Sequence, residues 1–321
     1  IWSGTTLESR EPTLRRAAFL LAGKVPTEAA LKRVKASDKA LKWDLKQLMS
    51  GDGFHDFLVT AANDRLLTDG LNNGIDWQFN FRTRFPAFYA FELSLPERMP
   101  EEFDTDEYWD KPFLSQNDAN HEVRVATIRE PVELIAYIAE NNRSYQEVVT
   151  ADYTMVNQFT ALAYQADVDF DNPITDDNGF YNRGHLNTFK PARNAGHIPF
   201  TNENDFDEES GEYTVTEYHE WPHSGVLTMP AWLGRYPSTD TNRNRARARW
   251  TYYHFLGVDI EKSAPRSTDP VALADTNNPT MNNPACTVCH ERMDPVAGAY
   301  QSFGDQGHYL DRWEGLDSLP D

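Results

Sequence analysis

The sequence has little of what marks several large classes of protein. No run of about 18 apolar residues occurs in its 321 residues, so we expect no membrane-spanning helix. Basic residues are also few, since 30 lysines and arginines stand against 50 aspartates and glutamates, for a net charge of −20. Such a surface repels nucleic acid and anionic membranes. We therefore expect no nucleic-acid ligand.

Cysteine is scarce, because Cys286 and Cys289 are the only two in the chain. A disulfide between them would close a strained, very short loop. A zinc site would need two further thiolate or imidazole ligands at comparable spacing, and the sequence has no second cysteine pair. These absences exclude a disulfide framework and disfavour a zinc finger.

What the sequence does contain is the stretch Cys286-Thr287-Val288-Cys289-His290. Two cysteines three positions apart, with a histidine directly after them, have the spacing that attaches a c-type haem. The thiols add to the two haem vinyl groups as thioethers, and the adjacent imidazole reaches one face of the ring, where its nitrogen can bind iron. We predict one covalent haem c with His290 as the proximal iron ligand.

Apolar spacing predicts a mainly α fold, a helical scaffold with long irregular loops and a C-terminal cytochrome c-like haem-binding segment. Leu14, Ala18 and Leu21, for example, share one helical face. We predict three parts: a helical domain over residues 1–165, an acidic, loop-rich insertion over 166–220, and a haem-binding segment over 221–321 that packs on the helical domain.

Alternating carboxylates in the insertion suggest two interpretations. Asp167, Asp169 and Asp171, followed by residues 176–178, supply hard oxygen donors of the kind that calcium prefers. The glycine at the sixth position and the glutamate at the twelfth position of an EF-hand loop are missing. A solvated acidic loop is therefore favoured, with a calcium site as the alternative.

Four arginines alternate ahead of the haem motif, at 243, 245, 247 and 249. Guanidinium groups bind carboxylates through two parallel hydrogen bonds, so we predict that Arg245 and Arg249 pair with the haem propionates. The alternative is that the cluster neutralises the neighbouring acidic insertion.

The motif leaves the second iron ligand open. Met293 lies three residues beyond His290, on the same side of a helical turn, which disfavours it as a ligand on the opposite face of the ring. We predict His223 or Met229, from a segment that can fold over the haem. The remaining candidates are His254, Met281, His308 and an iron whose sixth position holds water or no ligand.

Several phrases of the sequence resemble a large bacterial family of exported proteins, best known from planctomycetes. These phrases are Asp152-Tyr153-Thr154 with Asn157, residues 225–228, the arginine-rich approach to Trp250, and, most specifically, residues 286–295 continuing through Gly298 and Phe303 to Gly307. Members have helical domains of uncharacterised function followed by a segment with one CxxCH. An arginine is common where His308 stands, and the long acidic insertion is not typical. The resemblance implies an exported haem protein and says little about its reaction.

Taken together, these features predict an exported monohaem c-type cytochrome that transfers electrons and lies in the periplasm, at the cell surface or outside the cell. The chain starts at Ile1 without a basic and then apolar leader, as expected of a product whose signal has been removed. Its acidic surface favours redox partner proteins with a basic docking surface, within a larger redox assembly.

Two other functions are compatible with the sequence. One is a haem enzyme of peroxidase or oxygenase type with an open distal site. The other is a polysaccharide-associated binding protein that uses the aromatic residues between Trp77 and Phe91.

Overall fold

The structure of the protein is a computed structural model. It describes residues 8–73, 85–103, 113–171, 173–176, 179–180, 186–195, 198–199, 206–207, 212–213, 218–239, 242–265, 267–304, 307 and 309. Helices dominate these residues, which confirms the prediction of a mainly α fold. Among them, no helix is both long and apolar enough to cross a membrane.

The elements are as follows. The longer helices are α1 (Arg10–Ala22), α2 (Glu28–Ala36), α3 (Asp38–Leu48), α4 (Asp52–Leu66), α6 (Pro86–Ser94), α7 (Gln116–Glu140), α9 (Gln158–Ala163), α10 (Pro230–Arg235), α11 (Arg245–Leu256) and α14 (Pro284–Ala299). The short helical turns are η1 (Thr68–Asn73), η2 (Glu101–Phe103), α8 (Glu147–Thr150), η5 (Ile260–Lys262), α12 (Pro270–Leu273) and α13 (Pro279–Asn282).

Three antiparallel pairs of short strands accompany the helices. They are β1 (Thr154–Val156) with β2 (Lys190–Ala192), β3 (Ile198–Pro199) with β6 (Tyr218–His219), and β4 (Phe206–Asp207) with β5 (Glu212–Tyr213). All but β1 lie in the predicted insertion. The described part of that stretch therefore consists of loops connected by short paired strands of two or three residues.

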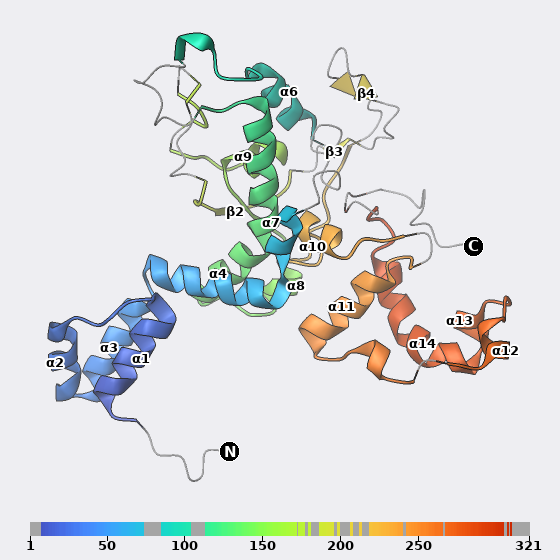
Figure 1. Ribbon diagram of the computed structural model, residues 1–321, viewed down its shortest axis with the longest axis horizontal. Helices are drawn as coiled ribbons and strands as arrows, with labels where there is room; N and C mark the ends of the chain where they lie inside the picture. Colours follow the sequence, from blue (N-terminus) through green and yellow to red (C-terminus); the bar gives the residue numbers. More distant parts are fainter. Residues whose placement is uncertain are drawn as a thin grey trace. The chain divides into compact units, whose positions relative to one another are not determined.

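Contacts divide the chain into two compact units, of which the first comprises Ile1–Leu67 and Val132–Val148. Helices α1, α2 and α3 pack together there around buried Leu14, Ala18 and Val34 (Figure 1), as the apolar spacing predicts. The second unit comprises Thr68–Pro131 and Val149–Asp321. The limits of these two units do not coincide with the predicted domain boundaries at 165/166 and 220/221. The three predicted parts stay predictions.

In the first unit, a charged histidine joins α4 to the end of α7. His55 Nε2 lies 3.2 Å from Glu133 Oε2, and its Nδ1 lies 3.2 Å from Glu140 Oε1. The hydrogen bond with Glu133, helped by the charges of both carboxylates, raises the pKa of His55 to about 9. The imidazole is therefore protonated at neutral pH, and each nitrogen donates to a carboxylate.

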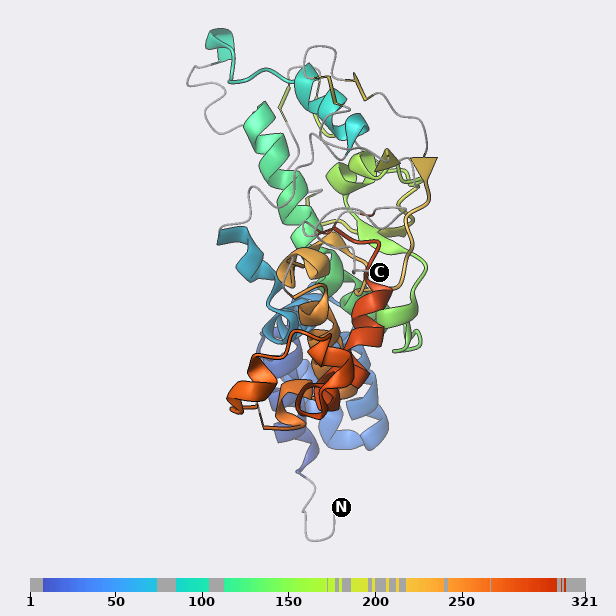
Figure 2. The ribbon, with the colours of Figure 1, turned by 90° about the vertical axis from the view of Figure 1, so that its right-hand side faces the viewer.

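The larger core of the second unit lies around α6, α9 and the first part of α7 (Figure 2), and includes buried Phe88, Leu114 and Phe159. Phe85 and Phe91 pack against it. Phe85, Phe88 and Phe91 thus contribute to the core, while Trp77, Phe79 and Phe81 lie outside the described residues.

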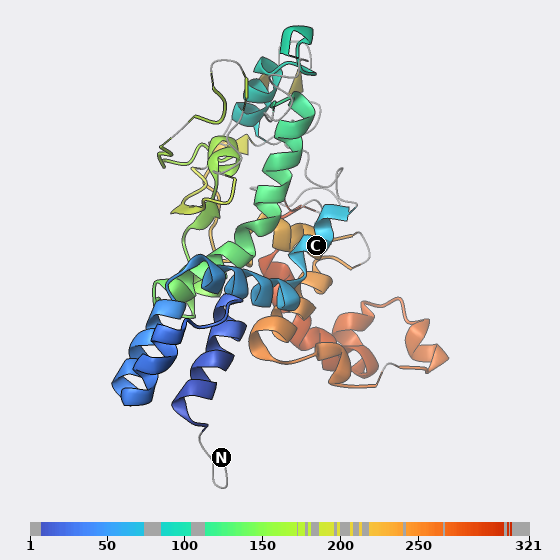
Figure 3. The same ribbon diagram turned by 60° about the vertical axis from the view of Figure 1, so that its left-hand side comes forward.

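The C-terminal part of the second unit is a group of helices with its own packing. Helices α11 and α14 lie side by side in Figures 1 and 3, η5 contacts both, and α13 packs on α14. This group carries the predicted haem motif.

Candidate haem site

The haem motif lies in the first two turns of α14. Asn283 caps the helix, because its side-chain oxygen accepts the backbone N–H of Ala285 at 3.0 Å. Pro284 occupies the first helical position, where its missing N–H costs nothing. Helical spacing then turns the two cysteines and His290 toward one face, since residues i, i+3 and i+4 are neighbours on a helix.

That face borders a cavity of about 510 Å³, a volume in the range of small-molecule and cofactor sites. The two cysteines, His290 and Met293 supply one wall. Helix α11, η5, the chain just after η5 and the end of α12 supply the others. Their apolar residues are Ala246, Trp250, Ile260, Ala264, Pro265 and Leu273, and their charged residues are Arg245, Arg249 and Glu261. The cavity thus combines apolar walls with a few charges beside the motif.

The residues around the cavity fit a covalently attached haem. Cys286 and Cys289 are both free and partly exposed, so their thiols are available for thioether formation. Ala246, Trp250 and Ile260 offer the apolar surface that a porphyrin face requires. When bound, the haem would supply a redox-active iron, and His290 would hold it on one face.

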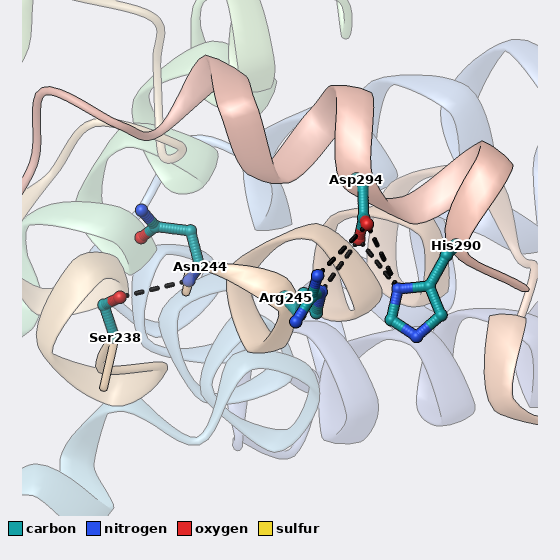
Figure 4. Close-up of polar contacts among 5 residues, drawn as sticks. All are labelled: Ser238, Asn244, Arg245, His290 and Asp294. Carbon is teal, nitrogen blue, oxygen red and sulfur yellow. Dashed lines mark hydrogen bonds and ion pairs between the residues drawn. The ribbon is translucent and has the colours of Figure 1, made fainter. Parts of the chain in front are cut away.

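One carboxylate bonds to His290, the predicted iron ligand (Figure 4). His290 Nδ1 lies 3.0 Å from Asp294 Oδ1 and 3.1 Å from Oδ2. The guanidinium of Arg245 donates to the same group, from Nε to Oδ1 at 2.8 Å and from Nη2 to Oδ2 at 3.1 Å. The carboxylate acceptor places the proton of a neutral imidazole on Nδ1 and leaves the lone pair on Nε2 for iron.

Asp294 is ionised in this arrangement. Partial burial favours its neutral form, but hydrogen bonds from Arg245 and His290 outweigh this effect and hold the pKa of Asp294 below its ordinary value. His290 therefore bonds to an ionised carboxylate, and Arg245 balances part of the negative charge of that carboxylate.

A left-handed turn positions Arg245 at the start of α11. Arg243 and Asn244 have φ angles of 45° and 65°, in the region that most side chains avoid. The buried hydroxyl of Ser238 accepts the backbone N–H of Asn244 at 3.0 Å and thereby holds the turn (Figure 4). The turn directs the first helical side chain toward Asp294.

The buried side chain of Arg247 holds the segments around the site together through hydrogen bonds. It donates to the backbone carbonyls of Tyr236, Leu233, Phe303 and Gly304 at 2.7–3.2 Å, and to the Asn244 side chain at 2.6 Å. These bonds tie α10, α11 and the segment after α14 together.

The structure brings both predicted arginines to the cavity. Arg245 binds Asp294, whereas Arg249 binds Asp259 at 3.3 Å and Glu261 at 2.9 Å. Their described carboxylate partners thus belong to the C-terminal segment. Pairing with haem propionates stays a prediction.

His223 and Met229 lie elsewhere in the second unit and are absent from the described residues that line the cavity. His223 Nε2 accepts the backbone N–H of Asn194 at 3.0 Å. Burial, followed by the charge of Arg193, lowers the pKa of His223 to about 4, so the ring is neutral. Met229 is buried at the N-terminal end of α10. In this arrangement both side chains are engaged away from the motif.

The other ligand candidates have diverse surroundings. His254 Nε2 lies 3.0 Å from the hydroxyl of Tyr236, within a cluster of aromatic rings. Met281 is exposed on α13, and Met293 borders the cavity beside His290. His308 lies outside the described residues.

Comparison with known families extends the sequence argument. The family model described as PSCyt3, a protein of unknown function (DUF1588), matches residues 223–312. Residues 223–312 are similar to a planctomycete cytochrome-associated domain. No curated protein and no solved structure matches the chain. The PSCyt3-like region contains the motif, Asp294 and every described residue that lines the cavity.

Two aspects of the PSCyt3-like region are not evident from sequence reasoning: the role of Asp294 and the cavity wall formed by Ile260 to Leu273. A carboxylate four residues after a predicted ligand histidine, on the same helical face, is the signal that would have found Asp294. The wall around η5 has no comparable local signal.

The aspartates considered for calcium lie outside this region. Asp167, Asp169 and Asp171 are exposed, while the residues between them, Val168 and Phe170, pack against the core. In the described part of the chain, no three histidine, cysteine or acidic side chains are arranged to hold a metal ion. Packing of Val168 and Phe170 against the core is a second explanation of the alternation, and calcium binding by the three aspartates stays a prediction. Asp177 and Asn178 are not among the described residues.

Proposed function

We propose that the protein is an exported monohaem c-type cytochrome that transfers electrons through a haem bound to Cys286 and Cys289, with His290 on the iron. The observation that carries this proposal is the cavity of about 510 Å³ against the CxxCH face of α14, lined by both thiols and His290. Similarity of residues 223–312 to a cytochrome-associated domain supports it.

Production in cells that contain a c-type haem maturation system tests the proposal. We expect the purified protein to carry one haem that resists acid–acetone extraction and gives a pyridine haemochrome spectrum of the c type. Cys286→Ser with Cys289→Ser removes the covalent haem. Val288→Ala, an exposed position between the two cysteines, serves as the matched control and keeps it. Absence of covalent haem from the unaltered protein would refute the proposal.

A haem enzyme of peroxidase or oxygenase type is the second candidate, favoured by the bond between His290 and Asp294. A carboxylate acceptor makes a coordinated imidazole a stronger electron donor, which stabilises iron in higher oxidation states. Spectra distinguish the two functions. A low-spin iron that ignores cyanide and peroxide supports the electron carrier, whereas a high-spin ferric iron that binds them supports the enzyme.

The second axial ligand belongs to this proposal as well, with His223 and Met229 as the candidates. Because neither lines the described cavity, their coordination requires the segment around them to move when the haem is present. Separate replacement of His223 and Met229 identifies the ligand through the change in the optical spectrum. No change with either variant would discard both.

A further inference from the structure

Asp294 and Arg245 make contacts around His290 that haem attachment itself does not need. Attachment needs the thiols of Cys286 and Cys289, and iron binding needs a single ring nitrogen. The second nitrogen, Nδ1, is nevertheless bound to a carboxylate that is also bound by a guanidinium. We propose that Asp294 is a positioning residue that strengthens His290 as a donor to iron, and that Arg245 limits this effect. The inference rests on the proposed function, since it requires iron on Nε2.

The geometry is built into the fold. His290 and Asp294 are four residues apart on α14, so one helix holds both partners, and Arg245 reaches them from α11. The side chains of His290, Asp294 and Arg245 are 21%, 33% and 24% exposed, so their charges are partly shielded from water. Partial burial strengthens interactions between charges, because less water screens them.

The two residues are expected to act on the iron in opposite directions. An anionic acceptor on Nδ1 raises the basicity of the coordinated imidazole. A more basic ligand stabilises ferric over ferrous iron and lowers the reduction potential. Arg245 donates two hydrogen bonds to the same carboxylate and draws electron density from it, which raises the potential.

The neighbouring pair of Arg249 and Glu261 provides matched controls. Its ion pair, at 2.9 Å, borders the same cavity and has the same charges. In the part of the chain that the structure describes, the ring of His290 bonds to Asp294 and not to Arg249 or Glu261. Replacement of these two residues therefore reports the effect of losing one charge at the cavity while the bond between His290 and Asp294 is kept.

The experiment is a spectroelectrochemical titration of haem-loaded protein. We expect Asp294→Asn to raise the reduction potential by more than Glu261→Gln does. We expect Arg245→Gln to lower it by more than Arg249→Gln does. The electron paramagnetic resonance spectrum of the ferric protein should change with Asp294→Asn and remain close to that of the unaltered protein with Glu261→Gln, because the carboxylate of Asp294 bonds to the ring of His290.

The outcomes separate this inference from the proposed function. An unaltered protein without covalent haem refutes the proposed function. A haem-loaded protein in which each variant and its control shift the potential equally overturns the positioning role alone. If Asp294→Asn yields no loaded protein, the comparison of Arg245→Gln with Arg249→Gln decides: a larger fall for Arg245→Gln supports the role, and equal falls overturn it.

Discussion

At the scale of single residues, the second unit contains a buried acid without a described cationic partner. Glu130 is completely buried and accepts hydrogen bonds from the hydroxyls of Tyr164 at 2.6 Å and Thr154 at 3.0 Å. Burial raises the pKa of Glu130 to about 8, although both hydrogen bonds favour the ionised form. The carboxyl is therefore largely neutral at pH 7, and the stability of the fold depends on its proton.

Glu130 predicts a specific pH dependence of stability. Because its folded-state pKa lies above the ordinary value of 4.5, the folded protein holds an extra proton between these two values. The contribution of Glu130 to the free energy of unfolding is therefore fully present below pH 4.5. It is lost as pH rises through about 8, which lowers the free energy of unfolding by on the order of 5 kcal/mol.

Urea denaturation between pH 4.5 and 9 measures this effect. Glu130→Gln should remove the part of the decline that this carboxyl causes between pH 4.5 and about 8, because glutamine occupies a similar volume and does not ionise. The part caused by His55, whose pKa of about 9 also lies above its ordinary value, should remain. The control is Glu97→Gln, at an exposed position, which should leave the curve nearly unchanged. An identical pH dependence in Glu130→Gln and the unaltered protein would show that Glu130 is not the responsible group.

At the scale of elements, the C-terminal helices are held by polar bonds as well as by apolar packing. Arg247 on α11 reaches carbonyls on α10 and in the segment that follows α14, and its side chain is fully buried. The planar guanidinium serves several acceptors at once, which the single ammonium group of lysine cannot reproduce. The relative placement of α10 and α11 therefore depends strongly on one residue.

We predict that Arg247→Lys lowers the free energy of unfolding by about 3 kcal/mol or more, since several buried carbonyls lose their donors. Arg249→Lys is the matched control. It changes the same residue type two positions further along α11, at a partly exposed ion pair, and should cost about 1 kcal/mol or less. Equal losses in the two variants, measured by urea denaturation, would contradict a framework role for Arg247.

At the scale of the whole molecule, the net charge of −20 governs encounters with charged reagents. A cationic electron donor is attracted to such a surface and an anionic one is repelled, and salt screens both effects. The same attraction is the physical basis for expecting redox partners with a basic surface.

Stopped-flow reduction of the haem-loaded protein tests this expectation. The second-order rate constant with a cationic ruthenium ammine should fall as ionic strength rises from about 10 mM to about 500 mM, a range over which the screening length shrinks several-fold. With anionic ascorbate it should rise. Rate constants that do not respond to salt would show that the charge is distributed away from the haem.

Local sequence signals account for many of the helices and, within the site, for the CxxCH motif and the start of the helix that carries it. Helices in the first unit follow from apolar spacing, and the Asn283 cap with Pro284 places the motif at the start of α14. Alternation of Asp167, Asp169 and Asp171 is equally visible, but the packing of Val168 and Phe170 against the core accounts for it as well as calcium binding does. Periodicity reports that one face is buried and does not say what the other face binds.

The sequence by itself determined the mainly α fold, the strong negative charge and the CxxCH motif, because helix periodicity, charge and motif spacing are local properties of the chain. Only the tertiary structure decided that Arg245 meets Asp294, that Arg247 is buried and that His223 bonds to Asn194. These pairs are separated by many residues or depend on burial. The pairing of Arg245 with Asp294 is set by how α11 and α14 pack, and not by any pattern within either helix.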